Sequence, residues 1–87
     1  MTQGRDIPIT SVRLGPQYHP TRLWTDPKAI AWVEHYRKLL RAGVVLDPIV
    51  VDPRLFIIDG HHRWYACKLE KRSTISAVIS STGRPLQ

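Results

Sequence analysis

The sequence predicts an α+β domain in which a small mixed β-sheet packs against two main helices. A helical pattern of apolar residues follows Asp26, two short β-branched runs flank a turn at residues 52–54, and a second helical pattern follows Gly60 directly. The predicted order is strand, helix, strand, strand, helix, strand. The 87 residues are expected to form a single domain, with a core at about residues 5–80.

The first element is predicted as a strand over residues 7–14, where apolar residues alternate imperfectly. Pro8 cannot donate a hydrogen bond to a neighbouring strand, so this strand is expected at an edge of the sheet. Gly15 and Pro16 end the strand. Residues 17–25 are polar and aromatic and are predicted to form a loop.

The first main helix is predicted over residues 27–42. Asp26 or Thr25 can cap it, and Pro27 suits its first position because no N–H is needed there. Gly43 is a natural C-terminal cap. Six side chains at helical spacing form the predicted packing face: Ala29, Trp32, Val33, Tyr36, Leu39 and Leu40. Trp32 is therefore expected in the core.

Two strands are predicted at residues 48–51 and 55–58, and their lack of alternation indicates that both faces are covered. A helix over residues 61–71 and a last strand over residues 74–79 follow. The predicted packing face of this second helix consists of three side chains: Tyr65, Ala66 and Leu69.

Composition narrows the classes of partner and compartment. The formal net charge of +6 suits a nucleotide, a nucleic acid or an acidic surface, although a basic surface alone explains it equally well. No apolar run approaches the ~18 residues that a membrane span needs. Cys67 is the only cysteine, and a signal-peptide pattern is lacking, so a cytoplasmic protein is expected. Cys67 itself is predicted to be a packing residue.

The sharpest local feature is the passage from a buried strand through Asp59 and Gly60 into a helix. A helix start carries unpaired N–H groups and positive partial charge, and therefore attracts anions. Arg63 can grip phosphate oxygens, while His61 and His62 can add donors. Asp59 can cap the helix, hold a cation or accept a substrate proton. An ordinary Asp cap on an exposed first turn explains the same residues.

At these residues the chain resembles the ParB/sulfiredoxin superfamily. The stretch Leu-Phe-Ile-Ile-Asp-Gly-His-His-Arg-Trp at residues 55–64 is similar to the core of ParB N-terminal domains. The resemblance implies a ParB/sulfiredoxin-like fold and a turn from Gly60 to Arg63 that binds the phosphates of a nucleoside triphosphate, with or without Mg²⁺. A weaker likeness of residues 17–22 to the Pro-x-Gln-Pro-Arg loop of ParB proteins implies that Arg22 and His19 assist.

The resemblance also bears on catalysis. ParB-like free serine kinases have an Asp that matches Asp59 and a Gly-x-His-x-Arg turn, which implies Asp59 and His61 as catalytic residues of a nucleotide hydrolase or phosphotransferase. His61 stands where sulfiredoxins have their catalytic Cys, so sulfiredoxin activity is not expected. Two other classes stay open: a DNA-binding or nuclease-like accessory protein related to partition proteins, and a non-catalytic regulatory or interaction domain.

The remaining expectations concern metals, DNA and bases. Adjacent His residues on a helix point about 100° apart, so no metal site is predicted. No helix-turn-helix pattern follows the stretch that resembles ParB, so any DNA binding is expected to be electrostatic and non-specific. A homodimer is left open. Tyr18, Trp24 and Trp64 can stack on a base or pack in the core.

Overall fold

The computed structural model describes residues 4–16 and 18–81. Its elements are β1 (Arg5–Pro8), the 3-10 helix η1 (Ile9–Ser11), α1 (Arg22–Thr25), α2 (Pro27–Arg41), β2 (Ile49–Val51), β3 (Ile57–Asp59), α3 (His61–Leu69) and β4 (Thr74–Ile79). The four strands form one sheet in the order β1-β4-β2-β3. β4 pairs antiparallel with β1 and parallel with β2, and β2 pairs antiparallel with β3. The prediction of an α+β domain with a small mixed sheet is confirmed.

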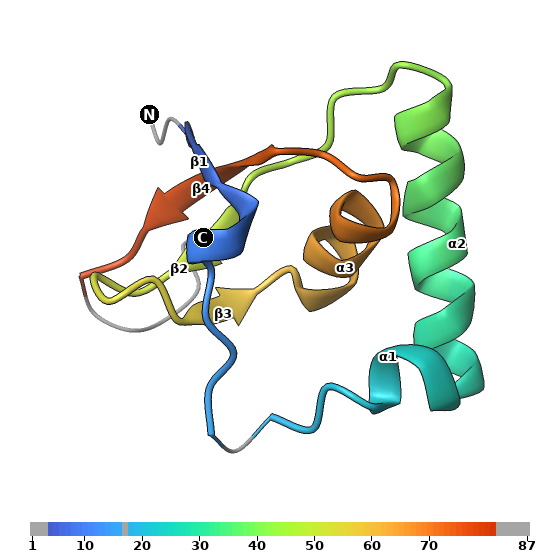
Figure 1. Ribbon diagram of the computed structural model, residues 1–87, viewed down its shortest axis with the longest axis horizontal. Helices are drawn as coiled ribbons and strands as arrows, with labels where there is room; N and C mark the ends of the chain where they lie inside the picture. Colours follow the sequence, from blue (N-terminus) through green and yellow to red (C-terminus); the bar gives the residue numbers. More distant parts are fainter. Residues whose placement is uncertain (1–3, 17, 82–87) are drawn as a thin grey trace.

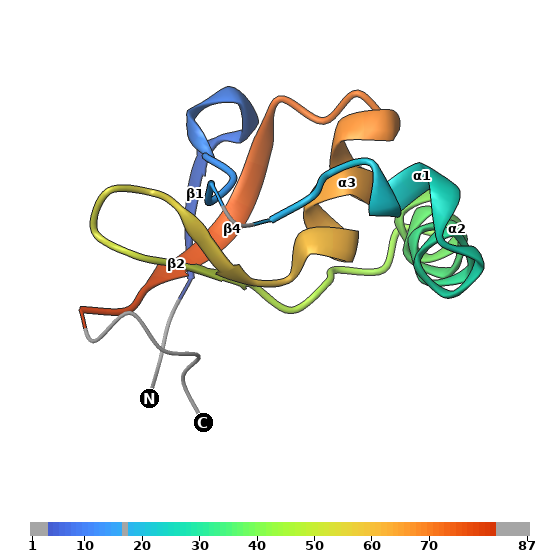
Figure 2. The same ribbon diagram turned by 90° about the horizontal axis from the view of Figure 1, so that it is seen from below.

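The domain has three layers, with α3 lying between the sheet and α2 (Figure 1). Figure 2 shows the same arrangement with α2 seen end-on at the far side of α3. The core lies where α3 meets the two central strands, and Ile49, Val51, Ala66 and Ala77 are almost completely buried there. Burial of such apolar side chains is the main favourable term in the folding of this domain.

The first strand is shorter than predicted, and the prediction of a strand over residues 7–14 is wrong beyond Pro8. The chain turns there into η1, where Ser11 Oγ donates a hydrogen bond to Pro8 O (2.7 Å) and Val12 N donates to Ile9 O (3.3 Å). Ile9 and Val12 are both buried, three residues apart. The broken alternation of the sequence thus reflects a tight helical turn rather than a strand.

The expected edge position of the first strand is confirmed, because β1 pairs with β4 alone among the described strands. At the opposite edge, β3 is covered by an isolated parallel bridge from Arg13 to Phe56. Arg13 N donates to Leu55 O and Ile57 N donates to Arg13 O, both at 2.8 Å. These bonds satisfy backbone groups that an edge strand would otherwise leave open.

The predicted loop over residues 17–25 contains the short helix α1 and is therefore corrected in its second half. Leu23, almost fully buried, anchors α1 in the core. Thr25 Oγ1 donates back to Thr21 O (2.8 Å), which closes the turn. This helix lies at the N-terminal end of α2 (Figure 1).

The start and end of α2 agree with the prediction to within one residue. Asp26 caps the helix by accepting a hydrogen bond from Lys28 N (3.0 Å), and Pro27 occupies the first turn. Gly43 has a φ of 80°, the left-handed conformation that follows many helices.

The expectation that Trp32 lies in the core is wrong, because 52% of its surface is exposed. The buried side chains of α2 are Ala29, Val33 and Leu40, which form a narrow stripe. Such a stripe suffices because the main neighbour of α2 is the single short helix α3. Trp32 stands beside the stripe and stacks on Tyr36 of the same helix, with 5.9 Å between ring centroids.

The turn predicted between β2 and β3 is confirmed. Asp52 accepts hydrogen bonds from Arg54 N (2.8 Å) and Phe56 N (2.9 Å). β3 begins two residues later than predicted, since Leu55 has a φ of 71° and belongs to the turn. Every residue of β2 is buried, whereas β3 runs out into solvent at Asp59, so the expected double coverage holds for β2.

α3 ends two residues before the predicted position, and its predicted packing face is wrong in part. Its buried residues are Trp64, Ala66 and Cys67, whereas Leu69 is 37% exposed. A helix between two layers buries two faces, and a single amphipathic stripe does not describe it. Cys67 packs in the core as predicted. The predicted bounds of β4 are confirmed.

Across the described residues, every helix is too short or too polar to span a bilayer.

Candidate functional site

Gly60 connects β3 to α3 without any intervening loop. It adopts the left-handed conformation, with a φ of 102° and a ψ of 26°. A Cβ atom at this position would lie 2.7 Å from Ile49 Cγ2 and 2.8 Å from Arg63 Nη2. Backbone conformation and lack of space therefore both require glycine here.

The start of α3 presents backbone N–H groups that the helix does not use. Its first internal hydrogen bond runs from Trp64 N to Gly60 O (2.9 Å), and no side chain in the described ranges caps the helix. The N–H groups of His61, His62 and Arg63 precede that bond and stand at the positive end of the helix dipole. The geometry is that of an anion-binding helix start.

Asp59 does not cap α3, which corrects one of the three roles considered for it. It is still part of β3, where it pairs with Val50, and Gly60 occupies the cap position instead. The Asp59 side chain is 59% exposed and its Oδ2 atom lies 3.8 Å from Arg63 Nη2. The carboxylate thus lies beside the turn and does not serve as the helix cap.

Arg63 lies with its side chain only 18% exposed, next to β2 and the turn. Its Nη2 atom donates to Pro48 O across 3.5 Å, at the limit of a hydrogen bond. Its Nε atom is buried and has no hydrogen-bond partner among the described residues. Buried donors are almost always paired in proteins, so the Arg63 Nε–H group can still donate a hydrogen bond to a ligand.

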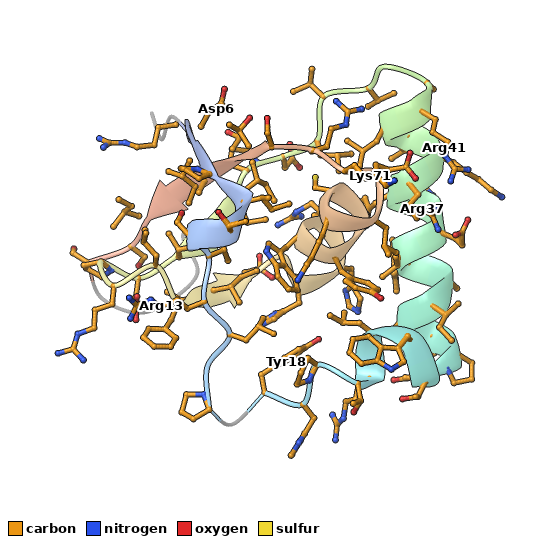
Figure 3. All side chains as sticks on the ribbon, in the orientation of Figure 1. Asp6, Arg13, Tyr18, Arg37, Arg41 and Lys71 are labelled. Atoms are coloured by element: carbon orange, nitrogen blue, oxygen red, sulfur yellow. The ribbon has the colours of Figure 1, made fainter. Side chains whose placement is uncertain are left out.

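His61 is held by stacking on Tyr18, with ring centroids 3.9 Å apart and planes inclined by 15°. Figure 3 shows Tyr18 on the segment that leads into α1. Burial lowers the pKa of His61, the neighbouring His62 lowers it further, and Asp59 opposes both effects. His61 therefore offers a neutral imidazole at neutral pH, which can donate or accept one hydrogen bond.

Two hollows border the turn. Asp59, the four residues that follow it and Tyr36 of α2 line a pocket of about 160 Å³. A second hollow of about 360 Å³ lies beside the stacked rings of His61 and Tyr18. Tyr36 was predicted as a core residue and not as part of a site. The packing of α2 on α3 brings it to the turn, and helical periodicity carries no signal of that contact.

Arg22 and His19 are the two predicted site residues that lie before α1 or at its start. Both side chains are exposed, and Arg22 N donates to His19 O (3.1 Å) where the chain enters α1. Neither residue lines the two hollows at the turn. Arg22 acts electrostatically on Tyr18: burial raises the pKa of Tyr18, and the charge of Arg22 offsets part of that rise.

Trp64 and Trp24 differ in burial, and stacking on a base stays a prediction. Trp64 is buried, with Lys68 Nζ 5.0 Å from the centre of its ring, and belongs to the core. Trp24 is exposed beside Tyr65, at 5.7 Å between ring centroids. In the part of the chain that the structure describes, no group of three or more His, Cys, Asp or Glu residues could hold a metal ion.

Comparison with known proteins places the fold. No known protein-family profile matches the chain. Over 37 residues it is 46% identical to a probable chromosome-partitioning protein ParB from Rickettsia bellii (strain RML369-C), a stretch that covers 42% of this chain and 13% of that protein. The structure superposes on a Pnob8-like ParB-N domain with a TM-score of 0.67 and 16% identity, covering 91% of this chain and 30% of the other.

Two structures of C-terminally truncated ParB from Caulobacter crescentus are also similar. The form in complex with CTP-gamma-S gives a TM-score of 0.67 at 24% identity, over 88% of this chain and 43% of that one. The form in complex with the centromeric parS site gives 0.62 at 22% identity, over 88% and 38%. The chain thus has the fold of a ParB N-terminal domain, and it spans less than half of each of the relatives named above. The predicted resemblance to ParB is confirmed, whereas the likeness to sulfiredoxin stays a prediction.

Proposed function

We propose that this ParB-like domain binds a nucleoside triphosphate, with the phosphates on the N–H groups of residues 61–63 and the guanidinium of Arg63. The observation that carries the proposal is a helix start that no described side chain caps, beside a buried arginine nitrogen that has no partner among the described residues. CTP is the first nucleotide to test, because a similar ParB structure contains CTP-gamma-S.

The energetics favour exchange of the present Arg63 contacts for phosphate contacts. The contact to Asp59 spans 3.8 Å and is half open to water, so it contributes about 0–1 kcal/mol. A charge-assisted hydrogen bond to phosphate contributes about 1.5–3 kcal/mol. His61 adds a hydrogen bond but no charge at neutral pH, because burial lowers its pKa. Arg63 therefore supplies most of the side-chain attraction.

Asp59 is the residue that decides between a binder and an enzyme. Its exposed carboxylate stands at the turn and is not used as a cap. Mg²⁺ is commonly held by one or two carboxylates together with substrate phosphates, and Asp59 fits the protein part of such a set. We infer that Asp59 binds the metal or accepts a proton during nucleotide hydrolysis or phosphotransfer, with His61 as the second candidate for the proton.

The test is a titration of the ¹⁵N-labelled domain with CTP, ATP, GTP and ADP, each with and without magnesium. We expect a triphosphate to shift the backbone amide signals of residues 60–63 in NMR spectra. Arg63→Ala should abolish these shifts, while Arg54→Ala, at an exposed arginine in the β2–β3 turn, should preserve them. Asp59→Asn should remove turnover and spare binding. Failure of every nucleotide to bind would leave the turn as a structural element only.

DNA is a second candidate partner, supported by the net charge of +6 and by the parS complex of a similar ParB. Backbone contacts of a basic domain give an affinity that falls steeply with salt and carries little sequence preference. Fluorescence anisotropy with several duplexes at two salt concentrations tests this. A strong preference for one duplex at physiological salt would contradict the non-specific mode. Cytoplasmic location and dimerisation stay predictions.

A further inference from the structure

A larger pocket lies on the other side of Arg63 from the turn. Its volume is about 390 Å³, within the range of about 300–1,000 Å³ that is usual for small-molecule sites. Its walls come from the connection between α2 and β2, from α3, and from the connection between α3 and β4. The first of these connections passes over α3 at the top of Figure 1. Arg63 lines both this pocket and the small hollow at the turn.

One wall of the pocket is positively charged. Arg63 and Arg72 both line it, and the charges of both guanidiniums act on the thiol of Cys67, whose pKa burial raises. Arg72 is fixed in place because its Nη2 atom donates to Leu40 O (3.1 Å). Among the described residues that line the pocket, Asp47 is the single carboxylate, and it is exposed. The buried Nε atom of Arg63 still lacks a partner among the described residues.

The facing wall is apolar. Leu40, Val44, Val45 and Leu46 line it in sequence around the end of α2. Val45 is 92% exposed, and Val44 beside it is also exposed. Two neighbouring valines that stay in water at the rim of a pocket are apolar surface available to a ligand.

We propose that this pocket binds a small organic carboxylate that carries an apolar body. The carboxylate lies between Arg63 and Arg72, where it accepts charge-assisted hydrogen bonds from the two guanidinium groups. The apolar body lies against Leu40, Val44 and Val45. The site shares Arg63 with the proposed triphosphate site, whereas its other lining residues differ from those of the hollow at the turn.

The probe is 4-tert-butylbenzoate, titrated into the ¹⁵N-labelled domain. We expect shifts of the amide signals of residues 43–47 and 72–76, with the signals of residues 60–62 little changed. The neutral 4-tert-butylbenzamide and the cationic 4-tert-butylbenzylamine share the apolar body and lack the negative charge. Both should bind at least about ten-fold more weakly, because the charge-assisted bonds are lost. Equal binding of the carboxylate and the ammonium compound would overturn the proposal.

Variants at the rim separate ligand binding from folding. Because Val45 is almost fully exposed, Val45→Asp and Val45→Lys should leave the melting temperature unchanged. Both changes remove the apolar contact of Val45, but Val45→Asp should weaken binding of the benzoate more than Val45→Lys, because its added charge repels the carboxylate. Arg72→Gln should weaken binding by about ten-fold. The probe should also slow alkylation of Cys67, the only cysteine. Equal affinities of the two Val45 variants, or no binding of the benzoate, would refute the site. Triphosphate shifts at residues 60–63 report on the other proposal separately.

Discussion

Opposite ends of α3 carry two clusters of arginine and carboxylate that differ in how fully their groups are used. Just beyond the C-terminal end, Glu70 accepts hydrogen bonds from Arg37 Nε (2.7 Å) and from Arg41 Nη2 and Nε (2.9 and 3.1 Å). At the N-terminal end, Asp59 and Arg63 approach only to 3.8 Å. Figure 3 shows Arg37 and Arg41 along α2. The Glu70 cluster joins α2 and α3. The Asp59 cluster holds the Arg63 guanidinium by a long contact only, so its N–H groups can still bind a ligand.

The comparison teaches where to look for function in a small basic domain. The three hydrogen bonds to Glu70 have a structural role, because they pair its carboxylate with both Arg37 and Arg41. A buried arginine nitrogen without a partner costs folding free energy, and a ligand can repay that cost. Both clusters contain the same chemical groups, so the degree of satisfaction separates the candidate site from the scaffold.

The largest effect is expected for Gly60→Ala. The left-handed backbone alone costs an alanine about 1–3 kcal/mol, and the new methyl group collides with Ile49. Gly15→Ala is the matched control, since nothing lies within 4 Å of its Cβ position and its φ is not left-handed. Urea unfolding measures both variants. Equal midpoints for the two would show that the turn does not need glycine.

A smaller effect is expected from neutralising each carboxylate. Glu70→Gln should lower the melting temperature clearly, because Arg37 and Arg41 lose their shared anion and face each other as like charges. Asp59→Asn should change it little, because a long and exposed pair contributes under about 1 kcal/mol. Thermal unfolding by circular dichroism checks the order. The comparison between the clusters breaks down if Asp59→Asn is the more destabilising change.

The smallest effects are expected in the pH dependence of folding stability, where the two ends of α3 should lose stability in different pH ranges. Burial lowers the pKa of His61 below its usual 6.5, so the unfolded chain binds more protons and stability falls as pH drops below that value. Hydrogen bonds from Arg41 and Arg37 lower the pKa of Glu70 below its usual 4.5, so its contribution is complete above about 4.5 and is lost in more acidic solution.

Unfolding measured from about pH 2.5 to pH 8 should therefore show two losses of stability as the pH falls. His61→Gln should remove the one nearer neutral pH, and Glu70→Gln should remove the acidic one. The assignment of each step fails if its variant keeps the wild-type slope in that range.

Elements that depend on local chemistry could be predicted from the sequence. The start of α2 follows from an Asp cap and a proline, and the β2–β3 turn follows from Asp52 holding two backbone N–H groups. The sequence alone could not show which side chains at the edges of each packing face are buried. Trp32 and Leu69 satisfy helical periodicity and yet are exposed, because the neighbours of each helix decide which side is covered.

The candidate site shows the same division. The sequence predicts the turn from Gly60 to Arg63, because strand, glycine and helix follow one another directly. The stack of Tyr18 on His61 and the position of Tyr36 at the turn are tertiary contacts without a sequence signal. The cap role considered for Asp59 fails by a single residue, since the strand continues through it and Gly60 becomes the cap.

The central claim is that the unsatisfied cluster, and not the satisfied one, binds triphosphate. Isothermal titration calorimetry with CTP and magnesium on the wild type, Arg63→Gln and Arg41→Gln tests it most directly. We expect binding by the wild type and by Arg41→Gln, and a loss of at least about ten-fold in Arg63→Gln, since at least one charge-assisted hydrogen bond is removed. Equal affinities of the two variants, or no heat of binding in the wild type, would contradict the account.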